Sequence, residues 1–384
     1  MFRIPYGRQE VTDGDIAAVV EVMRSNWLTQ GPAVPLFESR LASYVGAQFA
    51  VATNSATSAL HVACVALGLS AGKRLWTVPN TFVASANCGR YCGAEVGFVD
   101  IDPDTYCLDP VALRMKLLSA QAAGTLPDVV VAVDFAGQPC DLDALLELKN
   151  EFGFRLIEDA SHAVGASYGV HRVGAVPGVD VTIFSFHPVK IITSGEGGML
   201  VTNDAELAAT AQRLRTHGIQ RPGDPLLDCT QGAWYYEQQT LGWNYRMIDL
   251  EAALGESQLR RIDHILARRR ALAERYVELL RDLPVTLPHQ RSGRLSSYHL
   301  YPVLFSDAAK RRKVFDGMRA AGIGVQVHYM PVHLQPYYRA RGNDVGDFPV
   351  AENYSSRTLS LPLFPTLTDD EQVEVVDTMR GLLK

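Results

Sequence analysis

Short apolar segments alternate with segments of helical pattern over the first two-thirds of the chain, and this alternation constrains the fold most strongly. Apolar runs of three to six residues are expected as strands at 48–53, 75–78, 96–99, 129–133, 155–157, 181–184 and 199–202. The expected helices cover residues 14–24, 34–44, 57–67, 110–121 and 142–152, and another begins near Ser85. Strands separated by helices predict a doubly wound α/β fold, in which helices cover both faces of a mostly parallel sheet.

A different pattern follows in the last third of the chain. One long helix is expected over residues 249–281. After it we expect strands at 298–305 and 325–328, a helix at 308–321, an extended piece at 357–361 and a final helix at 369–383. This order predicts a smaller C-terminal α+β domain. We place the boundary inside the long helix, so that residues 1–255 form the large domain and residues 256–384 the small one.

The charge balance argues against nucleic acid and membrane surfaces as partners. The chain carries 36 Lys and Arg against 42 Asp and Glu, a formal net charge of -6. Its longest basic run, Arg268–Arg269–Arg270, is interpreted as the solvated face of a helix rather than as a nucleic-acid patch. A site for a small anion, which needs only a few local donors, is compatible with this balance.

Composition and cysteine usage favour a folded cytoplasmic protein. Hydrophobic residues make up 47% and charged residues 20% of the chain, which excludes a disordered polypeptide. No apolar run approaches the roughly 18 residues of a membrane span, and residues 1–10 lack the apolar segment of a signal peptide. The cysteines are scattered without a CxxC pair, which indicates free thiols and no metal site; they are Cys64, Cys88, Cys92, Cys107, Cys140 and Cys229.

A run of small polar residues, 54–58, follows the first expected strand, at the edge of the sheet where open α/β folds bind ligands. It reads Asn-Ser-Ala-Thr-Ser and opens a helix. Free N–H groups at a helix N-terminus, with hydroxyl side chains beside them, favour a phosphate. An ordinary helix cap would explain the same residues, because Ser and Thr are preferred there in any case.

Charged residues follow two further strands. Glu158 and Asp159 end the strand at 155–157, where a functional carboxylate and a helix cap are both open readings. Lys190 follows the strand at 181–184, and no other of the seven lysines is expected at the end of a central strand. Burial there lowers the pKa of an amine and makes it a Schiff-base nucleophile; a surface lysine on a loop is the alternative.

A phosphate cup, a carboxylate and a buried lysine are the three parts that pyridoxal phosphate requires. The cup anchors the cofactor, the carboxylate holds the pyridine nitrogen protonated so that the ring acts as an electron sink, and the lysine forms the Schiff base. Each part alone is a weak signal. Their order along one doubly wound sheet favours a pyridoxal-phosphate enzyme.

Six motifs occur together, in an order that is specific for one known family. They are residues 54–59 (NSATSA), 80–87 (NTFVASAN), 157–163 (IEDASHA), 184–190 (FSFHPVK), 195–198 (GEGG) and 244–247 (NYRM). With these motifs essentially the whole chain resembles the DegT/DnrJ/EryC1/StrS sugar aminotransferases. The resemblance implies a fold type I (aspartate aminotransferase-like) transferase, pyridoxal 5'-phosphate as cofactor, and a homodimer with shared active sites.

The resemblance also implies roles for particular residues. Lys190 carries the cofactor, Asp159 pairs with the pyridine nitrogen, and His162 lies close to the ring. The other implied cofactor contacts are Thr57, Ser58 and Ser185 at the phosphate, Phe82 on the ring face, Gln138 near the cofactor hydroxyl, and Asn244 at the phosphate of the neighbouring subunit. Core packing would explain Phe82 equally well, and turn chemistry beside Pro139 would explain Gln138.

The implied substrates are L-glutamate and a nucleotide-linked keto-sugar. Within the family the chain most resembles the transaminases of pseudaminic acid biosynthesis, which act on UDP-2-acetamido-2,6-dideoxy-β-L-arabino-hex-4-ulose and make the 4-amino-L-altrosamine product; other nucleotide keto-sugars are the alternative. The substrate contacts expected from this resemblance are Tyr6, Trp27, Leu28, Thr29, His328 and Tyr329. A structural histidine is an equally open interpretation of His328.

One position departs from the family pattern, and three other functions compete with transamination. Asp134 stands where many relatives carry histidine, which puts in doubt any role borrowed for that position; His217 is assigned no role. A dehydrase on the same fold carries histidine in place of Lys190. A non-catalytic regulatory protein would not need the set of Lys190, Asp159 and phosphate cup. A dinucleotide-binding dehydrogenase requires a glycine fingerprint that residues 194–198 lack.

Overall fold

The computed structural model describes residues 2–220 and 232–384, and its centre is a seven-stranded sheet with the order β1-β9-β8-β5-β4-β2-β3. Within this sheet β9 runs antiparallel to its neighbours β1 and β8, and the other neighbouring pairs are parallel. The strands are β1 (Phe49–Thr53), β2 (Arg74–Thr77), β3 (Glu95–Phe98), β4 (Val129–Val133), β5 (Arg155–Asp159), β8 (Val181–Ser185) and β9 (Gly198–Thr202). The predicted mostly parallel α/β sheet is confirmed.

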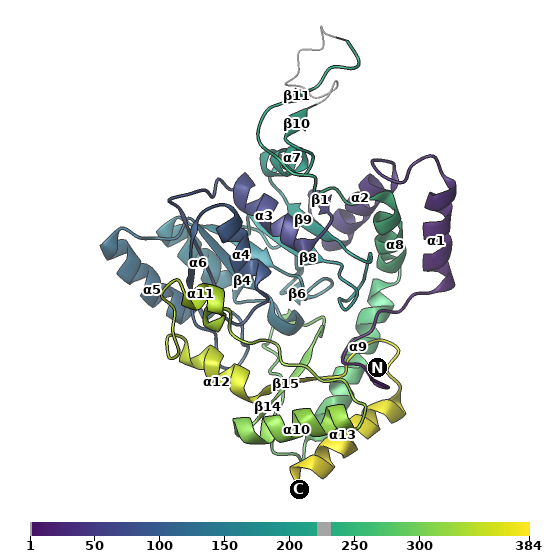
Figure 1. The fold of residues 1–384 in the computed structure, drawn as a ribbon, viewed down its shortest axis with the longest axis vertical. Helices are drawn as coiled ribbons and strands as arrows, with labels where there is room; N and C mark the ends of the chain where they lie inside the picture. The colour runs from purple at the N-terminus through teal and green to yellow at the C-terminus, as the bar shows by residue number, and fades with distance from the viewer. Residues whose placement is uncertain (1, 221–231) are drawn as a thin grey trace.

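Helices on both faces of this sheet follow the predicted pattern closely (Figure 1). The helices of this part of the chain are α1 (Asp13–Arg24), α2 (Ala33–Val45), α3 (Ala56–Ala66), α4 (Ala84–Tyr91), α5 (Pro110–Ala123), α6 (Leu142–Phe152) and α7 (Ala205–Leu214). Of these, α1 packs against the later helix at residues 249–259 and not against the sheet. Local chemistry sets their ends. The Thr12 hydroxyl accepts from Asp15 N while the Asp15 carboxylate accepts from Thr12 N, a capping box at the start of α1. Gly46 ends α2 in the left-handed conformation that glycine adopts without strain.

The single helix expected over residues 249–281 is in fact two helices, α8 (Asp249–Leu259) and α9 (Ile262–Leu280). The chain leaves the helical region at Arg261, whose φ is -113° and ψ 14°. The guanidinium of Arg261 donates to Glu10 O at 2.7 Å and to Asp15 Oδ2 at 2.9 Å. Because these partners come from the N-terminal segment, the sequence pattern of residues 249–281 could not predict the break between the two helices.

The basic run on α9 is not a solvated face, which corrects the prediction. The Arg269 side chain is only 1% exposed and donates to the carbonyls of Tyr298 at 3.2 Å and Leu363 at 3.0 Å. Burial lowers the pKa of Arg269 to about 10. Arg270 donates to Ser296 O and Gly165 O. The run therefore joins distant segments of the chain instead of facing water.

Two apolar clusters pack against the sheet, and at strand β1 they lie on opposite faces. Successive residues of β1 show the division, because side chains alternate along a strand. Val51 belongs to the cluster beneath α3, α4, α5 and α6. Ala50 and Ala52 belong to the cluster beneath α2, α8 and the first turns of α9.

A third cluster forms the small domain around a three-stranded antiparallel sheet. Its elements are β12 (Val285–Thr286), β14 (Tyr301–Phe305), β15 (Thr358–Leu361), α10 (Ala308–Ala320), α12 (Pro349–Arg357) and α13 (Asp369–Leu383). Residues 325–328, expected as a strand, make only an isolated bridge between Gln326 and Ser360. The expected strand at 298–305 begins at Tyr301, because Tyr298 has a positive φ of 48° and its carbonyl is held by Arg269. These are two further corrections.

The N-terminal segment belongs to the small-domain core. Ile4 is fully buried in the third cluster, and it pairs with Ile323 in a parallel bridge. Leu363 N donates to Tyr6 O at 3.1 Å. Along α9, Ile262 packs with the large domain and Leu272 with the small one. The domain boundary at residue 255 stays a prediction.

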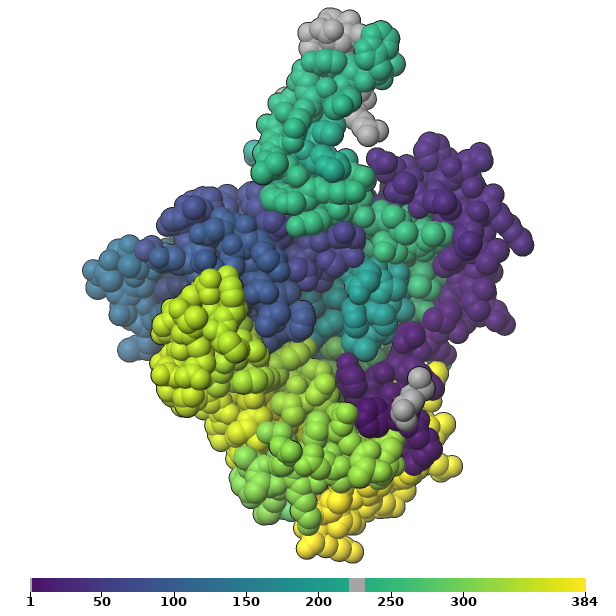
Figure 2. Space-filling model, viewed as in Figure 1, coloured from purple at the N-terminus to yellow at the C-terminus, as the bar shows by residue number. Residues whose placement is uncertain are grey.

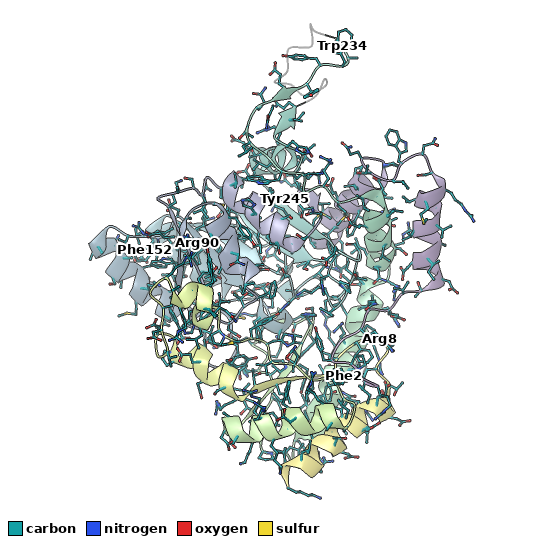
Figure 3. All side chains as sticks on the ribbon, in the orientation of Figure 1. Phe2, Arg8, Arg90, Phe152, Trp234 and Tyr245 are labelled. Carbon is teal, nitrogen blue, oxygen red and sulfur yellow. The ribbon has the colours of Figure 1, made fainter. Side chains whose placement is uncertain are left out.

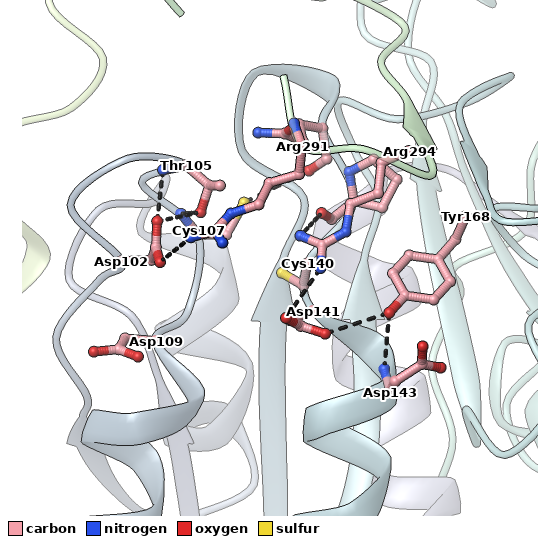
Figure 4. Close-up of polar contacts among 12 residues, drawn as sticks. Asp102, Thr105, Cys107, Asp109, Cys140, Asp141, Asp143, Tyr168, Arg291 and Arg294 are labelled. Atoms are coloured by element: carbon pink, nitrogen blue, oxygen red, sulfur yellow. Dashed lines mark hydrogen bonds and ion pairs between the residues drawn. The ribbon is translucent and has the colours of Figure 1, made fainter. Parts of the chain in front are cut away.

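Polar contacts also tie the two domains together on the side drawn in Figure 4. Arg291 donates to Asp102 Oδ2 at 2.8 Å, and Arg294 pairs with Asp141 Oδ2 at 3.0 Å. The remaining short elements are β6 (Ser167–Tyr168), β7 (His171–Arg172), β13 (Arg294–Leu295), η1 (Phe135–Gly137), η3 (Val332–Leu334) and α11 (Pro336–Arg339). Strand β13 pairs with β6, so this contact region contains backbone as well as side-chain links.

A two-stranded arm projects from the body of the molecule (Figures 1 and 2). It contains β10 (Ile219–Gln220), β11 (Glu237–Gln238) and the described residues 232–241 around them. Trp234 is 80% and Leu241 74% exposed. Figure 3 shows Trp234 far out on the arm, whereas Tyr245 lies on the body beneath it.

Within the described residues, no helix is long and apolar enough to cross a membrane. The same part of the chain holds no group of three or more His, Cys, Asp or Glu arranged to bind a metal. The free thiols found there are Cys64, Cys88, Cys92, Cys107 and Cys140, while Cys229 lies outside the described residues.

Candidate active site

A cavity of about 320 Å³ opens at the carboxyl ends of β5 and β8, between the large and small domains. Nine of the residues predicted from the sequence line it: Tyr6, Thr57, Phe82, Asp159, His162, Ser185, Lys190, His328 and Tyr329. They come from six separate parts of the chain. The cavity is thus a single site at the sheet edge where ligands of open α/β folds bind.

Lys190 lies on the connection between β8 and β9, where its backbone N donates to His187 O at 2.9 Å. Burial lowers the pKa of Lys190 to about 8, and the carboxylate of Asp159 opposes this effect. An amine with such a pKa is partly neutral near physiological pH. It can therefore act as a nucleophile and as a proton carrier.

Asp159 ends β5 and is only 4% exposed. Its Oδ2 accepts a 2.6 Å hydrogen bond from Ser85 Oγ, and its Oδ1 accepts from Ser161 Oγ at 2.5 Å and Ser161 N at 3.2 Å. Three hydrogen-bond donors hold the carboxylate in one orientation. Neither serine was predicted from the sequence, although both lie inside quoted motifs.

His162 lies between the backbone of η1 and the small domain. Its Nδ1 accepts from Ala136 N at 3.3 Å, which leaves the proton of the neutral ring on Nε2, 3.1 Å from the hydroxyl of Tyr329. Burial, with Lys190 as a second cause, lowers the pKa of His162 well below its usual value. The ring of His299, a cavity residue missed by the sequence analysis, lies 4.4 Å from that of His162.

The small-domain wall of the cavity carries His328 and Tyr329, joined by a cis peptide bond. Nδ1 of His328 lies 2.8 Å from Ser360 Oγ, and burial lowers the pKa of His328 to about 3. Burial raises the pKa of the Tyr329 hydroxyl. The ring of Tyr6 lies 5.5 Å from that of His328. This wall is therefore uncharged at neutral pH.

The N-terminus of α3 forms the large-domain wall. Ser55 caps the helix by accepting from Ser58 N at 3.1 Å, and the first intrahelical bond runs from Ala59 N to Ser55 O at 3.0 Å. The N–H groups of Ala56 and Thr57 precede that bond and so are left for an anion. A Cβ at Gly198 of β9 would overlap the Ala56 nitrogen, so only glycine lets the sheet approach the helix end so closely.

Six predicted residues are not part of the cavity lining: Trp27, Leu28, Thr29, Ser58, Gln138 and Asn244. The Ser58 hydroxyl donates to Asn54 Oδ1 at 2.6 Å. The Gln138 amide donates to His289 O at 2.9 Å and accepts from Arg291 N at 2.7 Å, so it joins the two domains outside the cavity. The predicted contact of Gln138 with the cofactor hydroxyl stays a prediction.

The remaining four residues of this set lie on the surface of the single chain. Trp27, Leu28 and Thr29 are exposed between α1 and α2, and Asn244 is exposed beneath the arm. None of them lines the cavity of its own chain. Their predicted contacts with substrate and with a neighbouring phosphate stay predictions.

Asp134, the departure from the family pattern, is fully buried behind Asp159. Its Oδ1 accepts from Cys140 N at 2.9 Å, and its own N donates to Asp159 O at 3.1 Å. Burial raises the pKa of Asp134 well above its usual value, and the pKa of the buried neighbour Glu158 rises to about 7 for the same reason. Asp134 therefore supports the strand ends and does not line the cavity.

The donor set of the cavity fits pyridoxal phosphate. Free helix N–H groups, Thr57 and Ser185 can receive a dianion, Asp159 can hold a protonated ring nitrogen, and Lys190 supplies the amine. The glycine at position 198 leaves the close backbone approach that such an anion site needs. Fold and site together define a pyridoxal-phosphate-dependent transferase of the aspartate aminotransferase type.

The chain belongs to the DegT/DnrJ/EryC1/StrS aminotransferase family, whose sequence model matches residues 9–380. It is 39% identical over 388 residues to the spore coat polysaccharide biosynthesis protein SpsC of Bacillus subtilis, covering 99% of this chain and 97% of that protein. The predicted family, fold type and cofactor are thereby confirmed.

Solved structures agree with this assignment. PseC of Helicobacter pylori, described as an aminotransferase involved in the biosynthesis of pseudoaminic acid, gives a TM-score of 0.91 at 28% identity, over 99% of each chain. Spr1654 of Streptococcus pneumoniae in its PMP form gives a TM-score of 0.90 at 29% identity, also over 99% of each chain, and a PLP form of that protein has been solved too. The protein is a pyridoxal-phosphate-dependent sugar aminotransferase.

Proposed function

We propose that this enzyme moves an amino group from L-glutamate to C4 of a nucleotide-linked 4-keto-6-deoxy sugar. The specific substrate proposed is UDP-2-acetamido-2,6-dideoxy-β-L-arabino-hex-4-ulose, which would place the enzyme in pseudaminic acid biosynthesis. The observation that supports this proposal most strongly is that Lys190 and Asp159 line the same cavity and interact electrostatically. The opposite wall of that cavity is uncharged. The likeness to PseC supports the choice of sugar. Another UDP-, dTDP- or GDP-linked keto-sugar is the competing substrate.

Lys190 is the proposed proton carrier. Bound pyridoxal phosphate supplies an electron sink that stabilises negative charge at the substrate carbon. With its pKa lowered to about 8, the Lys190 amine is basic enough to take a proton from that carbon and acidic enough to return one. The same residue serves both half-reactions, so ping-pong kinetics are expected.

Asp159 is the proposed partner of the ring nitrogen. A carboxylate held by Ser85 and Ser161 cannot turn away, so its charge stays directed toward the cavity. His162 is proposed beside the ring, oriented by Ala136 N and Tyr329. A neutral imidazole there adds no positive charge to compete with the protonated nitrogen.

The phosphate is proposed to bind at the N-terminus of α3, with Thr57 and Ser185 as hydroxyl donors. Ser58 is proposed to support the phosphate site from behind, because its backbone N donates to Ser55 Oγ and its hydroxyl donates to Asn54 Oδ1. Phe82 is 59% exposed at the cavity edge, which suits a ring that covers a planar cofactor rather than one that packs in the core.

A homodimer with shared active sites is proposed to complete the cavity. Asn244 is exposed beneath an arm whose exposed apolar side chains include Trp234 and Leu241. Exposed apolar side chains on a projecting segment fit burial against a second copy. In such a dimer Asn244 reaches the neighbouring phosphate, and the exposed residues 27–29 contact substrate across the interface. We propose that this dimer acts in the cytoplasm.

Absorption spectroscopy tests the proposal directly. Purified protein is mixed with pyridoxal phosphate, and its spectrum is recorded before and after L-glutamate and then after the UDP-keto-sugar. We expect a band from the lysine-bound cofactor, its loss with glutamate and its return with the sugar. A band that ignores glutamate would contradict the amino donor. A band that responds to glutamate but not to this sugar, while another nucleotide keto-sugar restores it, would contradict the proposed substrate.

A further inference from the structure

A hollow of about 420 Å³ opens on the surface where α11 lies beside α4 (Figure 1). Its lining shares no residue with the lining of the cavity, so it is a separate site. Small-molecule sites in proteins typically have volumes of about 300–1,000 Å³. The hollow is therefore large enough for a ligand of its own.

One face of α4 forms the first wall of the hollow. Its lining residues recur at the spacing of a single helix face, and they are Val83, Asn87, Arg90 and Tyr91. Ser85 lies on another face of the same helix, where its hydroxyl donates to Asp159 Oδ2. Helix α4 thus lies between the hollow and the carboxylate of the cavity.

The segment of α11 forms the second wall, and a hydrogen bond fixes it to the first. The Tyr338 hydroxyl donates to Asn87 Oδ1 at 2.7 Å, and the Tyr338 side chain is only 2% exposed. The ring of Tyr337 stands at 78° to that of Tyr338, with their centroids 5.1 Å apart. The two walls are therefore held together before any ligand binds.

Two arginines give the hollow a positive charge. Arg90, labelled in Figure 3, donates through Nη1 to Ala94 O at 2.6 Å, and its buried Nε has no hydrogen-bond partner within the described residues. The guanidinium carbon of Arg341 lies 3.6 Å from the centroid of the Tyr337 ring. In the described part of the chain neither arginine forms an ion pair, whereas Arg339 pairs with Asp344 at 2.8 Å. The lining contains no Asp or Glu, so an anion meets no opposing charge there.

Exposed aromatic rings stand beside these arginines. Tyr91 is 53% and Tyr337 47% exposed, although both line the hollow. A flat ring stacks on a nucleobase, and a guanidinium suits the geometry of a phosphate. The combination favours a ligand with both a planar group and phosphates over inorganic phosphate alone.

We propose that this hollow binds a nucleoside diphosphate group, at a site distinct from the amino-transfer cavity. Arg90 and Arg341 bind the phosphates, and the rings of Tyr91 and Tyr337 contact the base. The group has the same chemistry in a free nucleotide and in a sugar nucleotide. Because α4 also carries Ser85, binding in the hollow can act on the orientation of Asp159.

Photolabelling of the holoenzyme tests the site without reference to the sugar. The enzyme is irradiated with 5-azido-UDP, digested and analysed by mass spectrometry. We expect label on residues 83–91 or 335–341, and we expect excess UDP to suppress it. The absence of label there, or label confined to cavity residues such as Tyr6 and Tyr329, would overturn the proposal.

Two variants and a matched control assign the labelling to the hollow. Arg90→Met and Tyr337→Ala should each raise the half-saturating concentration of 5-azido-UDP for these peptides by about 10-fold or more. Arg339→Gln, which removes a guanidinium paired with Asp344, should label as wild type. Normal cofactor absorbance shows that each variant is folded. Equal labelling of the Arg90, Tyr337 and Arg339 variants would contradict the site.

Steady-state kinetics distinguishes the two sources of the nucleotide. If Arg90→Met raises KM for the UDP-keto-sugar by the same factor as it weakens labelling, the hollow holds the nucleotide of the substrate. If KM is unchanged and added UDP alters the kcat of the wild type but not of Arg90→Met, the hollow holds a free nucleotide. This comparison rests on the proposed sugar, whereas the labelling does not, so the failure of one is distinguishable from the failure of the other. Unchanged KM together with no effect of UDP on kcat would overturn both sources.

Discussion

Ser85 Oγ donates a 2.6 Å hydrogen bond to Asp159 Oδ2, although the two residues are far apart in sequence. Ser85 also lies 2.8 Å from Thr81 Oγ1, so the motif at residues 80–87 contributes a short chain of hydroxyls behind the carboxylate. The two sequence motifs around Ser85 and Asp159 therefore form one unit. Ser85, in the motif at residues 80–87, holds in place the carboxylate of Asp159, which belongs to the motif at residues 157–163.

Loss of Ser85 should weaken the hold on Asp159. We expect Ser85→Ala to lower kcat/KM by about 10-fold or more, since a hydrogen bond to a charged group contributes about 1.5–3 kcal/mol. Steady-state kinetics and cofactor titration measure the effect. Ser306→Ala, which removes a surface hydroxyl near Asp307, is the matched control. Equal activity of the Ser85 and Ser306 variants would contradict the positioning role.

Replacement of Lys190 by alanine should abolish turnover, with a loss of at least about 10²–10⁴-fold, while some cofactor binding remains. Lys116 offers a matched control, because burial also lowers the pKa of that amine to about 8 but places it away from the cavity, near Trp76. Lys116→Met should keep its activity. Turnover of Lys190→Ala at the wild-type rate would refute the assignment.

Lys190 should also give the apoprotein a pH-dependent stability. Its pKa is about 8 in the folded chain and about 10.4 when unfolded, so between these values the unfolded chain binds more protons. The free energy of unfolding of the wild type, relative to Lys190→Met, should therefore rise from pH 8 to about 10.4 and stay constant below pH 8. Urea unfolding at several pH values measures it; a difference independent of pH would rule out the lowered pKa.

Tyr329→Phe removes the hydroxyl that faces His162 Nε2 at 3.1 Å and leaves the cavity wall otherwise unchanged. We expect a modest fall in kcat, about 2- to 10-fold, because a neutral hydrogen bond contributes about 0.5–1.5 kcal/mol. Single-turnover rates with glutamate and with the sugar show which half-reaction slows. An unchanged kcat would mean that Tyr329 does not orient His162.

Mixed dimers test whether Asn244 serves the neighbouring site. If it does, a dimer of one Lys190→Ala chain and one Asn244→Ala chain holds one fully intact site and regains about half the wild-type activity per dimer. If Asn244 serves its own chain, no site is intact. Trp234→Ser combined with Leu241→Ser should shift the dimer toward monomer in sedimentation experiments, whereas Val170→Ser, at a position 94% exposed outside the arm, should not.

Strand periodicity predicted the sheet well, because strands and their following residues are local features of the sequence. Asp159 and Lys190 were predicted together because parallel strands end at one edge. Ser85, Ser161 and His299 were missed as cavity residues, since their contacts depend on how distant segments pack. Ser85 and Ser161 lie inside sequence motifs, and a search of those motifs for donors to Asp159 would have found them.

The errors have one physical origin, which is long-range contact by polar side chains. Arg269 looked solvated because its partners, the carbonyls of Tyr298 and Leu363, are far along the chain. The contacts of the Gln138 amide with His289 and Arg291 were likewise not predicted, because only the folded chain brings these residues together. Trp27 follows no strand, so nothing in the periodicity placed it at the sheet edge.

The burial of Ile4 in the small-domain core has a practical consequence for enzyme engineering. Tyr6 is held to the C-terminal segment by the hydrogen bond from Leu363 N to its carbonyl, and it lines the cavity together with His328 and Tyr329. In a chimera that exchanges only the C-terminal segment between relatives, the cavity wall at positions 328 and 329 would come from the relative, whereas Tyr6 would remain from this chain. Transplanting substrate preference therefore calls for moving residues 2–8 together with the C-terminal segment, as a discontinuous module.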